Sequence, residues 1–216
     1  MTKAETIERV TAGGVIPVIR AGSADEARTV IDAIVAGGID LIEITMTVPN
    51  ALRLIRQLST AYGSDVLIGA GTVLDPDTAK ACTEAGAQFI ISPALNFETI
   101  KFCNDEGVVV MPGALTPTEV VNAWKAGADF VKVFPAGAMG GASYLKSLKA
   151  PLPHVKMIPT GGVSQSTAAD FIRAGAEAVG VGADLVDLNA VRDGRSGSIT
   201  TAARNYLAIV AEARKS

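Results

Sequence analysis

Short apolar runs alternate with longer amphipathic stretches along the whole chain, and this alternation limits the folds open to it. Most of the runs carry apolar residues at both odd and even positions, as parallel strands covered on both faces do. The predicted strands are Ile16–Arg20, Leu41–Thr45, Val66–Ala70, Phe89–Ser92, Val108–Pro112, Phe130–Phe134, Lys156–Pro159 and Ala178–Gly182.

Helix start signals lie between these strands. Ser23–Glu26 has the pattern of a capping box, and Asp75 and Thr116 each precede a proline that suits a first helical turn. Eight strands alternating with eight helices in about 200 residues match a small (β/α)8 TIM barrel, here with a short N-terminal helix before the first strand. A doubly wound open sheet is the alternative. We expect a single α/β domain over residues 1–216, with Asp187–Ser198 as a surface loop.

A glycine repeat supports the barrel. Four glycines stand where a helix pattern gives way to a strand, a position that often needs positive φ: Gly38, Gly86, Gly127 and Gly175. They introduce alternate strands, which in a closed barrel contribute the side chains of one interior layer. The residues at equal distance after these glycines should therefore share one interior level: Glu43, Ile91, Lys132 and Gly180.

Composition excludes several classes of function. The net charge of −3 gives no basic surface for nucleic acid, and no apolar run approaches the ~20 residues of a membrane helix. Met1–Thr11 carries charges where a signal peptide is apolar, and Cys82 and Cys103 are too few for a disulfide framework. Carboxylates and histidine do not cluster at metal-ligand spacing. We expect a soluble cytoplasmic protein with no nucleic-acid, membrane or metal partner.

Two charged residues stand alone in apolar strands. Lys132 lies within Phe130–Phe134, and Glu43 lies within Leu41–Thr45. Burial favours the neutral amine, which can attack a ketone to form a Schiff base, and it lets a carboxyl group exchange protons near neutral pH. A structural ion pair is the alternative, although desolvation makes buried ion pairs poor sources of stability. The two side chains are predicted to lie at the same level of the barrel, near the carboxyl ends of the strands. This position favours a catalytic lysine with an acid/base glutamate over a structural ion pair.

Glycines follow the last two predicted strands. Gly161 and Gly162 come after the seventh strand, and Gly182 ends the eighth. At this position in a barrel, backbone N–H groups beside a helix N-terminus bind phosphate. Asp184 would repel a phosphate unless its side chain turns away to cap a helix, and we favour the cap.

Polar residues end other strands at the same rim. Arg20 is either a bidentate partner for a substrate carboxylate or an ordinary exposed strand-end residue. Thr72 could donate to the same carboxylate, and Thr47 and Pro93 also lie at this rim.

With these motifs in this order, the chain resembles the class I aldolases of the KDPG/KHG family. The family acts on 2-keto-3-deoxy-6-phosphogluconate (KDPG), 4-hydroxy-2-oxoglutarate (KHG) or 2-keto-3-deoxy-6-phosphogalactonate. The motifs that carry the resemblance are Gly37–Gly38, Leu41–Thr45, Ile68–Val73, Ile91–Pro93, Pro112–Gly113, Val131–Pro135 and Pro159–Val163.

The resemblance implies a role for each motif. Lys132 would form the Schiff base and Glu43 would be the general acid/base, in a homotrimer that needs no metal or other cofactor. The other implied site residues are Thr72, Pro93 and Phe134 around the pyruvyl part, and the backbone of Gly161, Gly162 and Gly182 around phosphate.

Two positions depart from the phosphogluconate-type pattern. Thr47 stands where some members have an arginine that binds the substrate carboxylate, and Arg20 could take over, as a similarly placed arginine does in phosphogalactonate-type members. Asp184 stands where the phosphogluconate type tends to have a serine.

We therefore expect retro-aldol cleavage of KDPG, with KHG as a further candidate substrate, to pyruvate and glyceraldehyde 3-phosphate or glyoxylate. Alternative substrates are the phosphogalactonate and an unphosphorylated 2-keto-3-deoxy sugar acid. Alternative functions are a sugar-phosphate isomerase or epimerase, with Glu43 as its base, and a catalytically silent barrel used for binding. The expected partners are the keto acid, pyruvate and two further copies of the chain.

Overall fold

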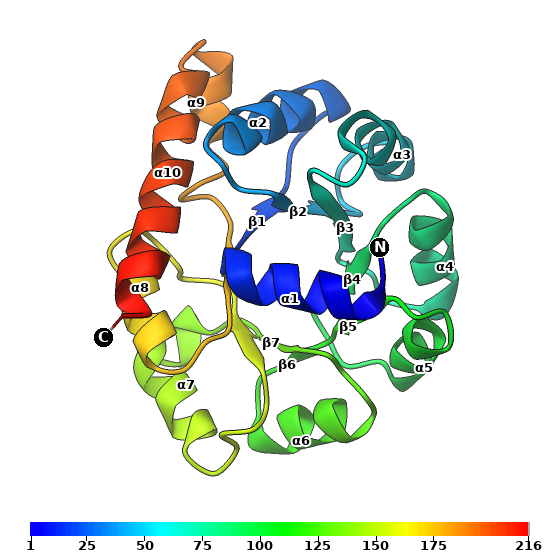
Figure 1. The fold of residues 1–216 in the computed structure, drawn as a ribbon, viewed down its shortest axis with the longest axis vertical. Helices are drawn as coiled ribbons and strands as arrows, with labels where there is room; N and C mark the ends of the chain where they lie inside the picture. The colour runs from blue at the N-terminus through cyan, green and yellow to red at the C-terminus, as the bar shows by residue number, and fades with distance from the viewer. Residues whose placement is uncertain (216) are drawn as a thin grey trace.

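The computed structural model describes residues 1–215, and it shows a ring of short parallel strands surrounded by helices (Figure 1). The strands are β1 (Val15–Ile19), β2 (Leu41–Thr45), β3 (Leu67–Gly71), β4 (Phe89–Ile91), β5 (Val109–Met111), β6 (Gly113–Ala114), β7 (Val131–Val133), β8 (Met157–Pro159) and β9 (Val179–Val181).

The strands pair in parallel in two groups, ordered β5-β4-β3-β2-β1-β9 and β6-β7-β8. Only Pro112 separates β5 from β6. Both are hydrogen-bonded to the segment that contains β7. Asp129 N donates to Val110 O at 3.1 Å, and Lys132 N donates to Pro112 O at 2.9 Å. A parallel bridge between Thr160 and Gly180 joins the other two ends. The predicted (β/α)8 barrel is confirmed, with its fifth strand split in two.

Helices cover the outside of the ring (Figure 1). Asp75 and Thr116 cap α4 (Pro76–Glu84) and α6 (Pro117–Lys125) as predicted, and a proline occupies the first turn of each helix. The outer helices are α2 (Ala24–Ala36), α3 (Ala51–Tyr62), α4 (Pro76–Glu84), α5 (Phe97–Asp105), α6 (Pro117–Lys125), α7 (Ala142–Lys149), α8 (Ala168–Arg173) and α10 (Ser196–Ala213), with a 3-10 turn η1 (Gly137–Met139) before α7. No helix in this described part of the chain is both long enough and apolar enough to span a membrane.

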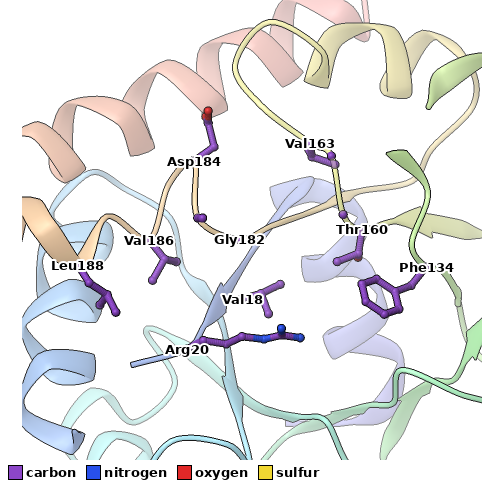
Figure 2. A pocket seen from close by; sticks show the side chains of 12 residues that line it. Val18, Arg20, Phe134, Thr160, Val163, Gly182, Asp184, Val186 and Leu188 are labelled. Carbon is purple, nitrogen blue, oxygen red and sulfur yellow. The ribbon is translucent and has the colours of Figure 1, made fainter. Parts of the chain in front are cut away.

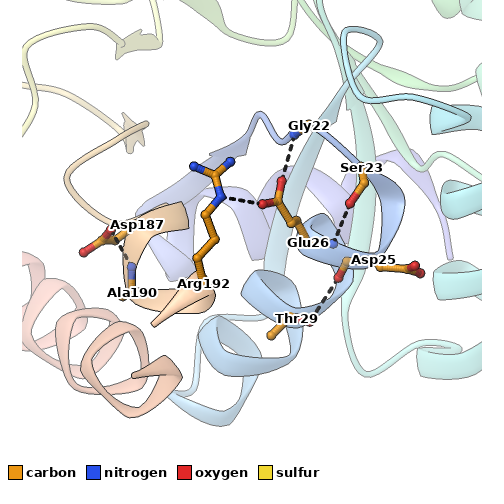
Figure 3. Close-up of polar contacts among 8 residues, drawn as sticks. All are labelled: Gly22, Ser23, Asp25, Glu26, Thr29, Asp187, Ala190 and Arg192. Atoms are coloured by element: carbon orange, nitrogen blue, oxygen red, sulfur yellow. Dashed lines mark hydrogen bonds and ion pairs between the residues drawn. The ribbon is translucent and has the colours of Figure 1, made fainter. Parts of the chain in front are cut away.

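The predicted surface loop 187–198 is wrong, because this segment contains α9 (Leu188–Arg192) and the start of α10. Asp187 caps α9 by accepting a hydrogen bond from Ala190 N at 3.0 Å (Figure 3). Arg192 at the other end of α9 forms an ion pair with Glu26 of α2 at 2.7 Å. So short a helix gives no apolar period that the sequence alone could reveal.

The predicted capping box at the start of α2 is only half formed. Ser23 Oγ accepts a hydrogen bond from Glu26 N at 3.1 Å, as an N-cap should. The Glu26 carboxylate, however, accepts from Gly22 N at 3.1 Å and from Arg192, so that it does not return to Ser23 N (Figure 3).

Helix α1 (Lys3–Gly13) lies across one end of the barrel (Figure 1). Arg9 of α1 donates to the Asp40 carboxylate and to the carbonyls of Ser64 and Asp65, which lie just before β2 and β3. α1 therefore covers the end at which the strands begin. The interior next to it is filled by apolar side chains, namely Val10, Ile16, Leu41, Leu67, Phe89, Ile91, Val109, Met111, Phe130, Ile158 and Ala178.

Both predictions from the glycine repeat are confirmed. The four glycines have nearly equal positive φ angles, 98° at Gly38, 104° at Gly86, 95° at Gly127 and 97° at Gly175. The residues predicted to share one interior level all line one small space inside the barrel, namely Glu43, Ile91, Lys132 and Gly180.

Candidate active site

The side chains that point into the barrel change from apolar to polar toward the ends of the strands. Successive strand residues face opposite sides, so the residues two positions after an interior residue also point inward. Leu41 and Phe130 belong to the apolar interior cluster. Two residues after Leu41 and Phe130 come Glu43 and Lys132, which line the small interior space above that cluster.

Lys132 and Glu43 face each other inside the barrel. The Lys132 Nζ atom lies 3.4 Å from Glu43 Oε1, and the two residues are only 4% and 1% exposed. The same Nζ atom lies 5.5 Å from the centre of the Phe134 ring. An amine and a carboxyl group in contact and away from water can exchange a proton directly, which is what imine chemistry requires of them.

Glycines in neighbouring strands leave the room that these side chains occupy. A Cβ atom on Gly71 would lie 2.0 Å from Glu43 Oε1, and one on Gly180 would lie 2.2 Å from Thr160 Oγ1. Neither distance is possible between non-bonded atoms. The position of the Glu43 carboxylate therefore depends on the missing side chain at Gly71.

A cavity of about 420 Å³ opens above this pair, at the ends of β1, β7, β8 and β9 (Figure 2). Thr160 lines both the cavity and the interior space around Lys132, so the two spaces adjoin. Arg20 extends across the cavity toward Phe134 (Figure 2). Besides Phe134, the apolar side chains in the wall are those of Val18, Val163, Ala183, Val186 and Leu188.

The structure brings most of the predicted rim residues together at this cavity. Six of them line it: Arg20, Phe134, Gly161, Gly162, Gly182 and Asp184. Thr47, Thr72 and Pro93 lie outside this lining. Thr47 Oγ1 lies 2.7 Å from Thr45 Oγ1, and Thr72 has a φ of 59°, which is unusual for a β-branched residue.

Another glycine, Gly113 of β6, allows the loop at Pro93 to pack closely against the strands around Lys132. A Cβ atom on Gly113 would lie 2.2 Å from the carbonyl carbon of Pro93, so only glycine admits the loop here. Gly113 is the register partner of Lys132, which places the Pro93 loop beside the strand position of the lysine.

Arg20 is the only cationic side chain among the residues that line the cavity. The Asp184 side chain turns away from it, as predicted, but it caps no helix. Its Oδ2 atom accepts hydrogen bonds from Tyr206 OH at 2.5 Å and from Gln165 N at 3.2 Å. Burial, together with this carboxylate, raises the pKa of Tyr206 far above its ordinary value. Within residues 1–215, no group of histidine, cysteine and acidic side chains is arranged to hold a metal ion.

Two residues of the site were not predicted as site residues. Thr160 stands two positions after the interior residue Ile158, so strand alternation alone could have placed it inside the barrel. Tyr206 belongs to α10, far along the chain from the strands, and its spacing on an amphipathic helix is that of an ordinary core residue. No sequence signal distinguishes it.

A lysine and a carboxylate lie inside a (β/α)8 barrel, beneath a cavity at the carboxyl ends of the strands, which is the end at which barrel enzymes carry their active sites. Residues 6–202 match the family model of KDPG and KHG aldolase. The chain therefore belongs to the KDPG and KHG aldolase family, a family of carbon–carbon lyases, and the predicted family is confirmed.

Individual relatives agree with this assignment. The chain is 38% identical to the 2-dehydro-3-deoxy-6-phosphogalactonate aldolase of Escherichia coli (strain K12), over 79% of this chain and 83% of that protein. It is 37% identical to a 2-dehydro-3-deoxy-phosphogluconate aldolase of Pseudomonas aeruginosa, over 73% and 71%. The crystal structure of KDPG aldolase from Legionella pneumophila, with pyruvate captured as a covalent carbinolamine intermediate, matches with a TM-score of 0.84 at 30% identity, over 92% of this chain and 96% of that chain.

Proposed function

We propose that the protein cleaves KDPG reversibly to pyruvate and glyceraldehyde 3-phosphate through a Schiff base on Lys132. The observation that carries this proposal is the contact between the Lys132 amine and the Glu43 carboxylate, buried together below the rim cavity. The carbinolamine captured in the Legionella pneumophila relative supports the same covalent chemistry here.

The reaction uses these two groups in turn. The neutral amine of Lys132 adds to the C2 ketone, and Glu43, directly or through a water molecule, supplies the proton with which the carbinolamine oxygen leaves as water. The iminium then acts as the electron sink for the electron pair of the C3–C4 bond, which becomes the C2–C3 double bond of an enamine. Glu43, again a carboxylate, takes the proton of the C4 hydroxyl as the C3–C4 bond breaks and the aldehyde leaves. Protonation of the enamine at C3 and addition of water at C2 release pyruvate and restore the amine.

The rim residues orient the rest of the substrate. Arg20 is the cation available in the cavity for the substrate carboxylate, with Thr72 and Thr47 as further hydroxyl groups at the same rim. At the distal end, Gly161 and Gly162 have φ angles of 85° and 77°, a conformation that aims backbone N–H groups in directions other residues rarely reach. These N–H groups and that of Gly182 bind the 6-phosphate.

Related substrates remain as alternatives within the same chemistry. The 38% identity to a phosphogalactonate aldolase favours 2-keto-3-deoxy-6-phosphogalactonate as the first of these. KHG and unphosphorylated 2-keto-3-deoxy sugar acids follow. Comparison of kcat/KM for these four compounds identifies the substrate.

Borohydride reduction in the presence of pyruvate tests the covalent step. We expect a stable adduct of one pyruvate per chain, located by peptide mass at Lys132, and no adduct in Lys132→Arg. Lys156→Arg is the matched control, because Lys156 Nζ also lies 5.5 Å from an aromatic ring, that of Phe130, but outside the site. A protein that turns over substrate without a trapped ketone would be an isomerase or another barrel enzyme, not this aldolase.

We also propose that the protein acts as a homotrimer in the cytoplasm. Large apolar side chains at the surface support self-association, with Leu74 57% and Phe97 55% exposed in a single chain. Their chain segments lie side by side, because Asn96 next to Phe97 donates a hydrogen bond to Leu74 O at 3.3 Å. Cys82 and Cys103 are both free, as suits a reducing compartment. Light scattering of the wild type and of Phe97→Asp tests the trimer.

A further inference from the structure

Asp184 is the only acidic residue among those that line the rim cavity, and its carboxylate is held outside it (Figure 2). Two donors hold it there. Tyr206 OH donates to Asp184 Oδ2 at 2.5 Å, and the Gln165 N–H donates to the same oxygen at 3.2 Å. Asp184 follows β9 and Gln165 follows β8, so the carboxylate also joins the two loops that carry the cavity glycines.

The Tyr206 donor comes from the last helix of the chain. Tyr206 lies on α10 and is fully buried, so its hydroxyl has little freedom to move. The neighbouring residue Asn205 donates from Nδ2 to Gln165 Oε1 at 3.1 Å. α10 is itself fixed to α2, where Thr200 Oγ1 donates to Ala33 O at 2.8 Å. The helix thus supports both rim loops from behind.

Release of this carboxylate would change the cavity in two ways. A free Asp184 side chain could swing toward the cavity, where its negative charge would repel an anionic group of the substrate. It could also accept hydrogen bonds from the backbone N–H groups of the rim, which would then be closed to a phosphate. A carboxylate bound by a neutral hydroxyl and an amide does neither.

We propose that Tyr206 is a positioning residue of the substrate site, which keeps the cavity open to a phosphate by holding the Asp184 carboxylate away from it. The inference rests on the proposed function, because it assigns the rim to the phosphorylated end of the substrate. It adds that selectivity for a phosphorylated substrate depends on a tyrosine outside the cavity.

The test compares phosphate binding in four proteins, measured by calorimetry with inorganic phosphate, and KM for KDPG against KM for KHG. Loss of a hydrogen bond to a charged group corresponds to about a tenfold change in affinity. We expect Tyr206→Phe to weaken the binding of phosphate about tenfold. It should also raise the ratio of KM for KDPG to KM for KHG by about the same factor. The double variant Tyr206→Phe/Asp184→Asn should regain the lost affinity, because it no longer carries the charge. Tyr62→Phe is the matched control, since Tyr62 OH also donates to a carboxylate, that of Asp32, at 2.5 Å and far from the rim.

Several outcomes would overturn the inference. These are a double variant as weak as Tyr206→Phe, an equal rise in KM for KDPG and KHG, or the same loss in Tyr62→Phe. If Tyr206→Phe does not fold, Asp184→Glu and Asp184→Gln replace it, and the charged variant should bind phosphate about tenfold more weakly than the neutral one. Failure of the proposed function is seen separately, as a wild type without a borohydride adduct at Lys132, and the calorimetry with phosphate still decides the role of Tyr206.

Discussion

The interior of the barrel and the cavity at its rim meet at Thr160, but they are built differently. In the interior, the side chains to which we assign the chemistry come from strands, and register and burial fix Lys132 and Glu43 against each other. At the rim, loop backbone forms much of the wall, and Arg20, the one cation, is exposed. In the proposed function the interior therefore sets the reaction, whereas the loops and the helices behind them set which substrate fits.

This comparison predicts that substitutions in the barrel interior cause the largest loss of activity. Glu43→Gln removes the proton-transfer group but keeps its volume, so we expect kcat to fall by about 10²–10⁴-fold, with a smaller change in KM. Steady-state kinetics measure both. Glu212→Gln is the control, because Glu212 also forms an ion pair with a lysine, Lys215, at 2.9 Å, but at an exposed site outside the cavity, and should leave kcat unchanged. A Glu43→Gln protein with the kcat of the wild type would place the acid/base elsewhere.

A smaller but still large effect is expected from the glycine beside Glu43. In Gly71→Ala the new Cβ atom would lie 2.0 Å from Glu43 Oε1, so the carboxylate must move. Misplacement of a catalytic group by about 1 Å can lower kcat by about 10²-fold. Gly197→Ala is the control, because a Cβ atom there meets nothing within 4 Å and the residue lies on α10. Equal kcat values in the two variants would show that catalysis does not depend on the exact position of the Glu43 carboxylate.

The same division explains what could be predicted from the sequence. Lys132 and Glu43 are lone charges in apolar runs, and the glycine repeat placed them at one level because strand register is periodic. The rim was predicted only as glycines after strands. Its support from Tyr206 and from α9 could not be predicted, because these contacts join segments far apart in the sequence and use residues that look like ordinary core or loop. Asp184 was expected to cap a helix because a local partner is the only kind that the sequence displays.

At the rim, Arg20→Met should raise KM more than it lowers kcat. A charged hydrogen bond to the substrate carboxylate corresponds to about 10–100-fold in KM. KDPG and KHG share this carboxylate, so we expect equal factors for the two substrates. If KM rose for KDPG alone, Arg20 would bind the phosphate of the substrate rather than its carboxylate. Arg53→Met, at an exposed site on α3, is the control.

The smallest effect is expected at the cap of α6, whose residues line neither the interior space nor the rim cavity. Thr116 N and Leu115 N donate to Glu119 Oε2 at 2.7 and 2.9 Å, and these backbone bonds hold the pKa of Glu119 below its ordinary 4.5. Because the folded-state pKa is the lower one, the stabilisation is complete above about pH 4.5 and is lost as the pH falls through the folded-state value. Glu119→Gln should therefore lower the free energy of unfolding at pH 7 by less than about 1 kcal/mol, without changing kcat. The difference from the wild type should shrink in acid, as urea denaturation at several pH values would measure. A difference that grew as the pH fell would show that the carboxylate is not held in its charged form by the helix cap.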